Sequence, residues 1–239
     1  MNFYNEKLVM VLGSKPNSNF PDLQVEKIYA ANGASERANL YRKKYPDVLL
    51  FSLIGSREFE KNLDVQKRVI DANPDQVISR SGWINFEKYN FSDKTTFKYF
   101  TPSKQFFFQS KFFKLNFIDI LLKETFYEEK IYDKFSHFFK SLKKKEINGV
   151  STGFFSILYA LEKNMNYNII ISGIGMSGGG HYYNKDSSRY QKRSNVDKAL
   201  IKNLKKKFKD RLFTIDNELY ENTGINYIDL KTFTWKQNL

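Results

Sequence analysis

The stretch that decides the fold is LVMVLG at residues 8–13, an apolar run that ends at a glycine. A continuous apolar run of this length predicts a strand that is buried on both faces. Such strands belong to parallel sheets covered by helices on either side. A loop of turn-forming residues follows at 14–18.

An alternation of strand and helix patterns continues from this run toward the C-terminus. In the first third, strands are expected at 27–31, 48–54 and 77–79, and helices at 35–45 and 60–72, with Ser35 as the cap of the first helix. The rhythm resumes with a helix that starts at Ser151-Thr152 and runs to 161, a strand at 168–173, a helix at 195–209 and a strand at 211–215. This order predicts an α/β fold built on a Rossmann-like parallel sheet flanked by helices.

The region at 83–148 departs from this rhythm because it concentrates phenylalanines and lysines. Residues 118–142 are predicted to be helical, and four apolar side chains there recur at helical spacing: Phe135, Phe138, Phe139 and Leu142. Two interpretations stay open, a small aromatic core and a lid or face that meets a membrane or an acceptor. Since no repeat or flexible linker is present, residues 1–239 are expected to form a single domain with this insertion.

Composition narrows the class of protein. The chain of 239 residues has a net charge of +13 and no cysteine, which excludes disulfides and thiolate metal sites. A basic surface suits nucleic acid, an anionic membrane or acidic small substrates, but it is equally typical of a solvated surface with no partner. No apolar run is long enough to cross a bilayer, and the N-terminus lacks a signal-peptide pattern. We therefore expect a cytoplasmic protein, with peripheral contact to the inner face of the membrane left open.

Two loops follow predicted strands at the edge where open α/β sheets bind ligands. Gly13 and Ser14 come after the first strand, where free backbone N–H groups suit a phosphate, although the loop is neither a P-loop nor a dinucleotide fingerprint. Asn32 and Gly33 come after the second strand. The asparagine either contacts a base or ribose or simply makes the turn.

Three later segments carry a family resemblance. They read VSTGFFSILYAL at 150–161, NIIISGIG at 168–175 and GGGHYY at 178–183. Their order and spacing resemble the sialyltransferases of glycosyltransferase families 29 and 42, and the resemblance covers most of the chain except the aromatic middle. It implies a GT-A-type Rossmann-like sheet and a CMP-activated acidic sugar as donor.

The resemblance also implies roles for individual residues. Those expected to bind the nucleotide sugar are Gly13, Ser14, Asn32, Gly33, Ser151, Thr152, Gly153, Gly173 and Ile174. Within this set, the helix start at 151–153 would face CMP, where the helix dipole suits an anion, and Gly173 with Ile174 would line the cytosine pocket. Tyr183, or Tyr182 in its place, would steady the departing phosphate.

The catalytic base is the main departure from the family pattern. Both families place a histidine shortly before the helix expected at 195, where this chain reads YQKRS at 190–194. His137 lies among phenylalanines and is expected in the core or on the surface. His181 lies in a loop at the correct edge of the sheet and is expected to act as acceptor base or phosphate ligand. If it only binds phosphate, Asp186 or Asp197 must serve as base, or the enzyme is weak or inactive.

The expected reaction is an inverting, metal-independent transfer of sialic acid or a related ulosonic acid to a hydroxyl of a glycan or glycolipid. Lys15, Lys192 and Arg193 are candidate cations for the leaving phosphate. No Asp-x-Asp motif is present, Asp216-Asn217-Glu218 is interpreted as a turn, and no metal, cofactor or nucleic acid is expected. The alternatives are a CMP-Kdo transferase, a basic nucleic-acid-binding module and a catalytically degenerate CMP-binding protein.

Overall fold

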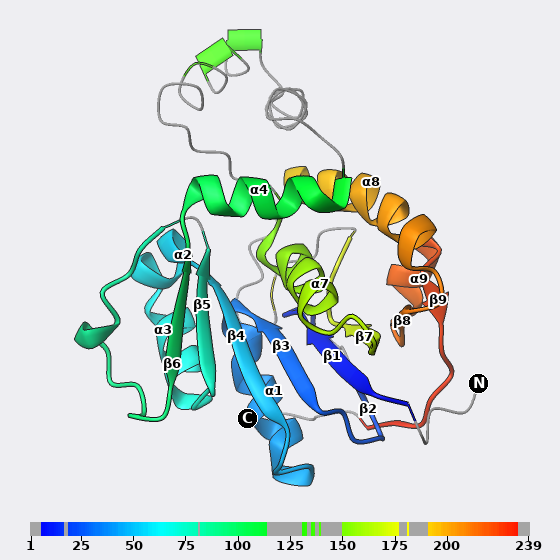
Figure 1. The fold of residues 1–239 in the computed structure, drawn as a ribbon, viewed down its shortest axis with the longest axis horizontal. Coiled ribbons are helices and arrows are strands. Elements are labelled where there is room, and N and C mark those ends of the chain that lie inside the picture. The colour runs from blue at the N-terminus through cyan, green and yellow to red at the C-terminus, as the bar shows by residue number, and fades with distance from the viewer. Residues whose placement is uncertain are drawn as a thin grey trace.

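The computed structural model describes residues 6–16, 19–80, 82–113, 131–132, 135–136, 139, 150–176, 181 and 191–233. Within them, eight parallel strands form one sheet in the order β6-β5-β4-β3-β1-β7-β8-β9 (Figure 1). The strands are β1 (Leu8–Leu12), β3 (Lys27–Ala31), β4 (Leu49–Gly55), β5 (Gln76–Arg80), β6 (Thr96–Phe100), β7 (Asn168–Ser172), β8 (Leu212–Thr214) and β9 (Asn226–Tyr227). A small antiparallel ribbon pairs β2 (Phe20–Pro21) with β10 (Thr232–Phe233).

Strand β1 lies at the centre of the sheet, as its continuous apolar pattern predicts for a strand buried on both faces. Met10 pairs with Ile28 of β3 on one side and with Ile170 of β7 on the other. From β1 the chain winds outward through β3, β4, β5 and β6, then returns to β7 and winds the other way. The boundary between β1 and β7 is therefore a topological switch point, where open parallel sheets bind their ligands.

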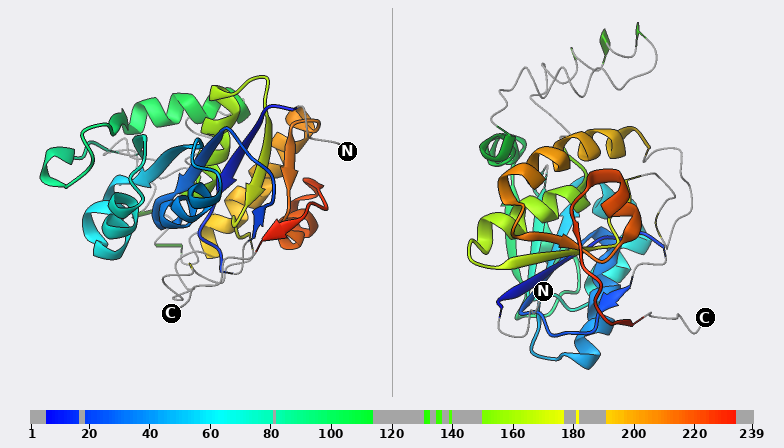
Figure 2. Two further views of the ribbon diagram at one scale, coloured as in Figure 1. Left: turned by 90° about the horizontal axis from the view of Figure 1, so that it is seen from below. Right: turned by 90° about the vertical axis from the view of Figure 1, so that its right-hand side faces the viewer.

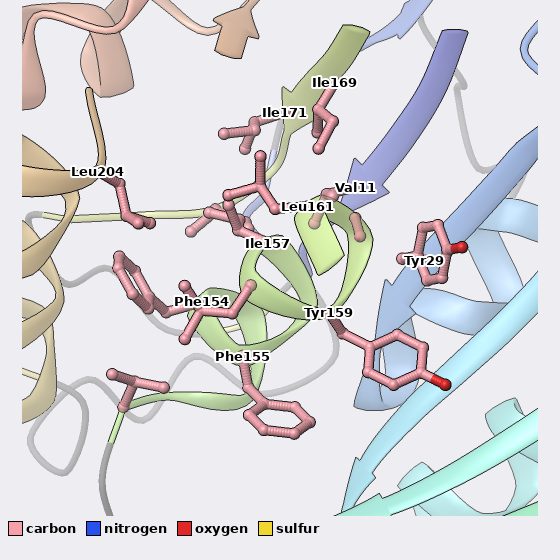
Figure 3. Packing of buried hydrophobic residues seen from close by; sticks show 14 of the residues in the cluster. Val11, Tyr29, Phe154, Phe155, Ile157, Tyr159, Leu161, Ile169, Ile171 and Leu204 are labelled. Atoms are coloured by element: carbon pink, nitrogen blue, oxygen red, sulfur yellow. The ribbon is translucent and has the colours of Figure 1, made fainter. Parts of the chain in front are cut away.

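Helices cover both faces of the sheet (Figures 1 and 2). One face carries α1 (Ser35–Lys44), α2 (Ser56–Lys61) and α3 (Leu63–Asp71), and the other carries α4 (Pro102–Phe113), α7 (Thr152–Lys163), α8 (Gln191–Phe208) and α9 (Asn217–Thr223). Side chains of β1 alternate between two buried clusters. Val11 packs with α7 (Figure 3) and Val9 belongs to the same cluster, while Met10 packs with the α1 side. The chain thus has an α/β, Rossmann-like fold.

The aromatic region begins inside the sheet, since β6 pairs in parallel with β5. The rings of Phe97 and Phe86 stack with centroids 4.4 Å apart on one face. On the other face the ring of Phe100 lies 5.3 Å from Phe155 of α7 and 5.5 Å from Phe108 of α4. Phe100 and Phe108 therefore extend the cluster on the α7 face and Phe86 belongs to a further cluster on the other face, whereas Trp83 and Phe107 are exposed. Most of the helix expected at 118–142 lies outside the described residues.

Four local predictions need correction. Ser35 does not cap α1: a 3-10 turn, η1 (Asn32–Ala34), precedes the helix, and the Ser35 hydroxyl donates to the carbonyl of Asn32 at 2.9 Å. The helix expected at 60–72 is two helices, because Asn62 interrupts it and caps α3 by accepting from the N–H of Val65 at 3.2 Å. The helix expected from 195 already begins at 191.

The fourth correction concerns residues 216–218. They do not form an isolated turn, because Asp216 is the residue before the first turn of α9.

Among the helices of the described part, none is long and apolar enough to cross a membrane.

Candidate functional site

The loops that follow β1 and β7 meet at the switch point. The N–H of Gly13 donates to the carbonyl of Ser172 at 2.8 Å, and the N–H of Lys15 donates to the carbonyl of Gly173 at 2.8 Å. A Cβ on Gly13 would lie 2.5 Å from the carbonyl carbon of Gly173 and closer still to its oxygen. Gly13 is thus required by close backbone approach, and Gly173 by its φ of 71°.

The N-terminus of α7 lies beside these loops. The Ser151 hydroxyl caps the helix by accepting from the N–H of Phe154 at 3.1 Å, which confirms the predicted cap. The Ser151 N–H in turn donates to a carboxylate oxygen of Asp197 at 3.1 Å. Ile174 packs between the two glycines: a Cβ on Gly153 would lie 3.5 Å from its side chain, and one on Gly13 only 2.8 Å away. The buried side chain of Ile174 therefore links the β7 loop to both partners.

His181 reaches the same edge from a different part of the sequence. Its Nδ1 is hydrogen-bonded to the hydroxyl of Ser14, and either group can be the donor. Burial lowers the pKa of His181 to about 4, so the imidazole is neutral at pH 7. The hydrogen bond joins two residues that the sequence assigned separately to the phosphate.

Asn32 and Gly33 follow the adjacent strand β3, as predicted. Asn32 has a φ of 50°, in the left-handed region that asparagine tolerates better than most residues. Its side-chain oxygen accepts from the N–H of Gly55 at 3.0 Å, which ties the end of β3 to the end of β4. Gly33 is buried within η1. The side chain of Asn32 therefore has a structural role, because it holds the ends of β3 and β4 together.

Sequence reasoning missed Asp216, which borders this site. One of its carboxylate oxygens accepts from the N–H of Gly173 at 2.6 Å. Burial raises the pKa of Asp216, opposed by that hydrogen bond and by the charges of Lys15 and Arg37. The residue follows β8, and its position after a strand was the signal that could have placed it at this edge.

A cleft of ≈ 390 Å³ opens next to Asp216. It is lined by Lys15, Pro16, Asn19, Ile215, Asp216, Asn217, Glu218, Tyr227, Ile228, Asp229, Leu230 and Thr232. Lys15 and Glu218 form an ion pair in its wall. Burial lowers the pKa of Lys15, and the charge of Asp216 opposes that effect. The Lys15 carbonyl also accepts from Arg37 at 2.9 Å, so the β1 loop is held on both sides.

The structure thus gathers most of the predicted residues at one edge of the sheet: Gly13, Ser14, Ser151, Thr152, Gly153, Gly173, Ile174 and His181. Tyr182, Tyr183, His137 and Asp186 lie outside the described residues, as do the side chains of Lys192 and Arg193. Their predicted roles therefore stay predictions. In the described part of the chain, no group of three or more His, Asp or Glu side chains could hold a metal ion.

Comparison with known proteins adds no relative: no family model, curated protein or solved structure matches the chain.

Proposed function

We propose that the protein is an inverting glycosyltransferase that moves sialic acid or a related ulosonic acid from a CMP-activated donor to a glycan hydroxyl. The observation that carries the proposal is the hydrogen bond between Ser14 and His181, 167 positions apart in sequence. It joins the motif after β1 to the His-Tyr-Tyr segment, beside the capped start of α7. Ser14, His181 and the start of α7 lie at the switch-point edge of the sheet, and each belongs to a segment in which the sequence resembles the sialyltransferases.

In the proposed reaction, the bond from the anomeric carbon to the phosphate oxygen of CMP breaks, and CMP leaves with the electron pair. The acceptor oxygen attacks the opposite face of that carbon, and its proton passes to a base. The first turn of α7, from Thr152 onward, offers N–H groups and the positive end of a helix dipole for the phosphate. In this scheme Tyr183 or Tyr182 steadies the leaving group, and no metal takes part.

The neutral state of His181 favours a role as phosphate ligand. With a pKa of about 4 the imidazole is a poor proton acceptor at pH 7, but a neutral imidazole can donate one hydrogen bond to a phosphate oxygen. Asp216 is then a better candidate for the base, because it lines the cleft next to the donor edge and burial raises its pKa. Asp197 is less suited, since it is buried at the start of α7 and is not among the described residues that line the cleft.

The finer features of the proposal follow the resemblance. The sheet would be of the GT-A type, and the remainder of the 83–148 region would act as a lid over the donor. The acceptor would be a glycan or glycolipid, and contact with a membrane surface would bring a lipid-linked acceptor within reach.

Thermal unfolding with CMP, UDP, GDP and AMP, in EDTA throughout, tests the proposal. A ligand that binds the folded state raises the midpoint temperature of unfolding. At a hundredfold excess over its dissociation constant, it adds about 2.7 kcal/mol to the free energy of unfolding. We expect a shift with CMP alone, reduced in Ser14→Ala and unchanged in the control Ser110→Ala, whose hydroxyl bonds within α4. A shift with UDP or GDP only would contradict the proposal, and so would the lack of a shift with every nucleotide at millimolar concentration.

Donor turnover separates the remaining alternatives. Release of CMP from CMP-sialic acid or CMP-Kdo identifies the donor. Binding of CMP with no release from either donor would instead identify a CMP-binding protein without transfer activity.

A further inference from the structure

The cleft beside Asp216 is acidic, whereas the donor edge, formed by Gly13, Ser14 and the start of α7, offers the N–H groups of a helix start. Among the described residues, its wall combines the carboxylates of Asp216, Glu218 and Asp229 with one lysine, Lys15, so this described lining carries a net negative charge. This acidity stands against a net charge of +13 for the whole chain. A CMP-sugar carries a phosphate and a carboxylate, so like-charge repulsion disfavours it in this cleft.

The polar groups of the cleft suit hydroxyls. Ionised carboxylates accept hydrogen bonds only, and the amides of Asn19 and Asn217 both donate and accept. Tyr227, 41% exposed, adds an aromatic body with a polar tip. A ligand rich in hydroxyl donors and free of negative charge matches this set, and a sugar ring is such a ligand.

The cleft is also connected to the donor edge through two short links. Lys15, in the cleft wall, is the residue after Ser14, which is hydrogen-bonded to His181. Asp216, which also lines the cleft, accepts from the N–H of Gly173 at 2.6 Å. The β1 loop therefore contributes to both the donor edge and the cleft, and the β8 loop, which lines the cleft, is hydrogen-bonded to the β7 loop at the donor edge.

We propose that this cleft is the acceptor subsite and that it selects an uncharged sugar, with Asp229, Asn217 and Tyr227 among its hydrogen-bonding groups. This inference rests on the proposed transferase function. It assigns the acidic cleft to the acceptor and leaves the switch-point edge to the donor. It also predicts that acceptors ending in an acidic sugar are rejected.

The test uses the full chain, labelled with 15N, and follows backbone amide shifts during titration. The probes are methyl β-glucoside, methyl β-galactoside, methyl β-glucuronide, spermidine and, in a separate titration, CMP. We expect neutral glycosides to shift amides of residues 215–219 and 227–230 and to bind at least about tenfold more tightly than the glucuronide at low salt.

A matched pair of variants assigns the binding to the cleft. Asp229→Asn should weaken the binding of the neutral glycosides about fivefold. It should also reduce the ratio of their affinity to that of the glucuronide. Asp210→Asn, an exposed aspartate outside the cleft, should change neither. Equal binding of the two glycoside classes, preference for spermidine, or an unchanged affinity in Asp229→Asn would overturn the inference.

The CMP titration separates this inference from the proposed function. Binding of CMP without binding of neutral glycosides overturns the acceptor subsite alone. Glycoside binding in the cleft without CMP binding overturns the transferase and leaves a sugar-binding cleft. Absence of both overturns both.

Discussion

The two ends of the same sheet edge are built in different ways. Around β1 and β7, the strands end in glycines whose backbones touch, and a cleft lies beside them. Around β5 and β6, the strands end in Arg80 and Phe100, and α4 packs onto them with aromatic rings. The guanidinium of Arg80 lies 5.4 Å from the ring of Phe155 and is almost completely buried.

The difference shows how one architecture separates binding from stability. Close backbone contact at the β1–β7 end requires glycines there, and the cleft lies beside it. Side-chain contact at the β5–β6 end fills the space and adds buried apolar area, which stabilises the fold. Substitutions at the two ends should therefore differ in size and kind.

The largest effect is expected at the aromatic end. Phe155 is fully buried, with ring contacts to Phe100 and Phe108, so Phe155→Ala should cost about 3–5 kcal/mol in the free energy of unfolding. Phe107→Ala, at a ring that is 66% exposed, should stay within about 0.5 kcal/mol. Urea unfolding measures both, and similar values for the two would show that α4 does not pack as described.

The glycine end is tested by the two glycines that contact Ile174. Gly13→Ala places a methyl group against the backbone of Gly173 and should cost about 2–3 kcal/mol. In Gly153→Ala, the nearest neighbour of the new methyl group is the Ile174 side chain, at an ordinary 3.5 Å, so this change inside α7 should be neutral or stabilise by up to about 1 kcal/mol. The same unfolding assay compares them, and a tolerated Gly13→Ala would refute the close approach.

A pH titration of stability probes His181. Its pKa is 6.5 ordinarily and about 4 in the fold. Below pH 6.5 the unfolded chain takes up a proton that the folded state does not. The contribution of His181 to the free energy of unfolding is therefore complete above pH 6.5 and is lost as the pH falls toward 4. The loss is no more than about 3 kcal/mol, and closer to about 2 because the ring keeps some solvent contact.

Other groups titrate in this window, so the measured quantity is the difference between wild type and His181→Asn. A difference that stays constant from pH 7 to 4 would show that the imidazole is not shielded at the glycine end.

The smallest effect is expected at the start of α7. Ser151→Ala removes the cap of Phe154 and should cost about 1 kcal/mol. The control Ser110→Ala removes a hydroxyl bond on the exposed side of α4 and should cost less than about 0.5 kcal/mol. If the two costs are equal, the capping bond contributes nothing specific to the switch-point edge.

Local patterns predicted the central elements well. β1, β3 and the capped start of α7 follow from apolar runs and a serine cap, which are signals within a few residues. β6 was missed because it is a half-exposed edge strand, whose sequence TFKYF has no continuous apolar run. Asn62 was missed as a break because the apolar spacing continues through it into α3.

The candidate site was predictable by position but not by pairing. Gly13, Ser14, Gly173 and His181 were each expected at the carboxyl edge of the sheet. The hydrogen bond of Ser14 with His181, and that of Asp216 with Gly173, depend on strand order, which no local pattern contains. For the same reason the acidic cleft could not be read from the sequence.

The position of β1 also has a consequence for synthesis on the ribosome. Leu8 pairs with Asn168, so one side of the central strand waits for a partner that lies 160 residues further along the chain. At about 5–20 residues per second, that wait is on the order of 10–30 s. During it, an apolar strand has an unsatisfied edge, which is open to pairing with other nascent chains. Slow translation between β6 and β7 should therefore lower the yield of native protein, and chaperones that shield strand edges should restore it.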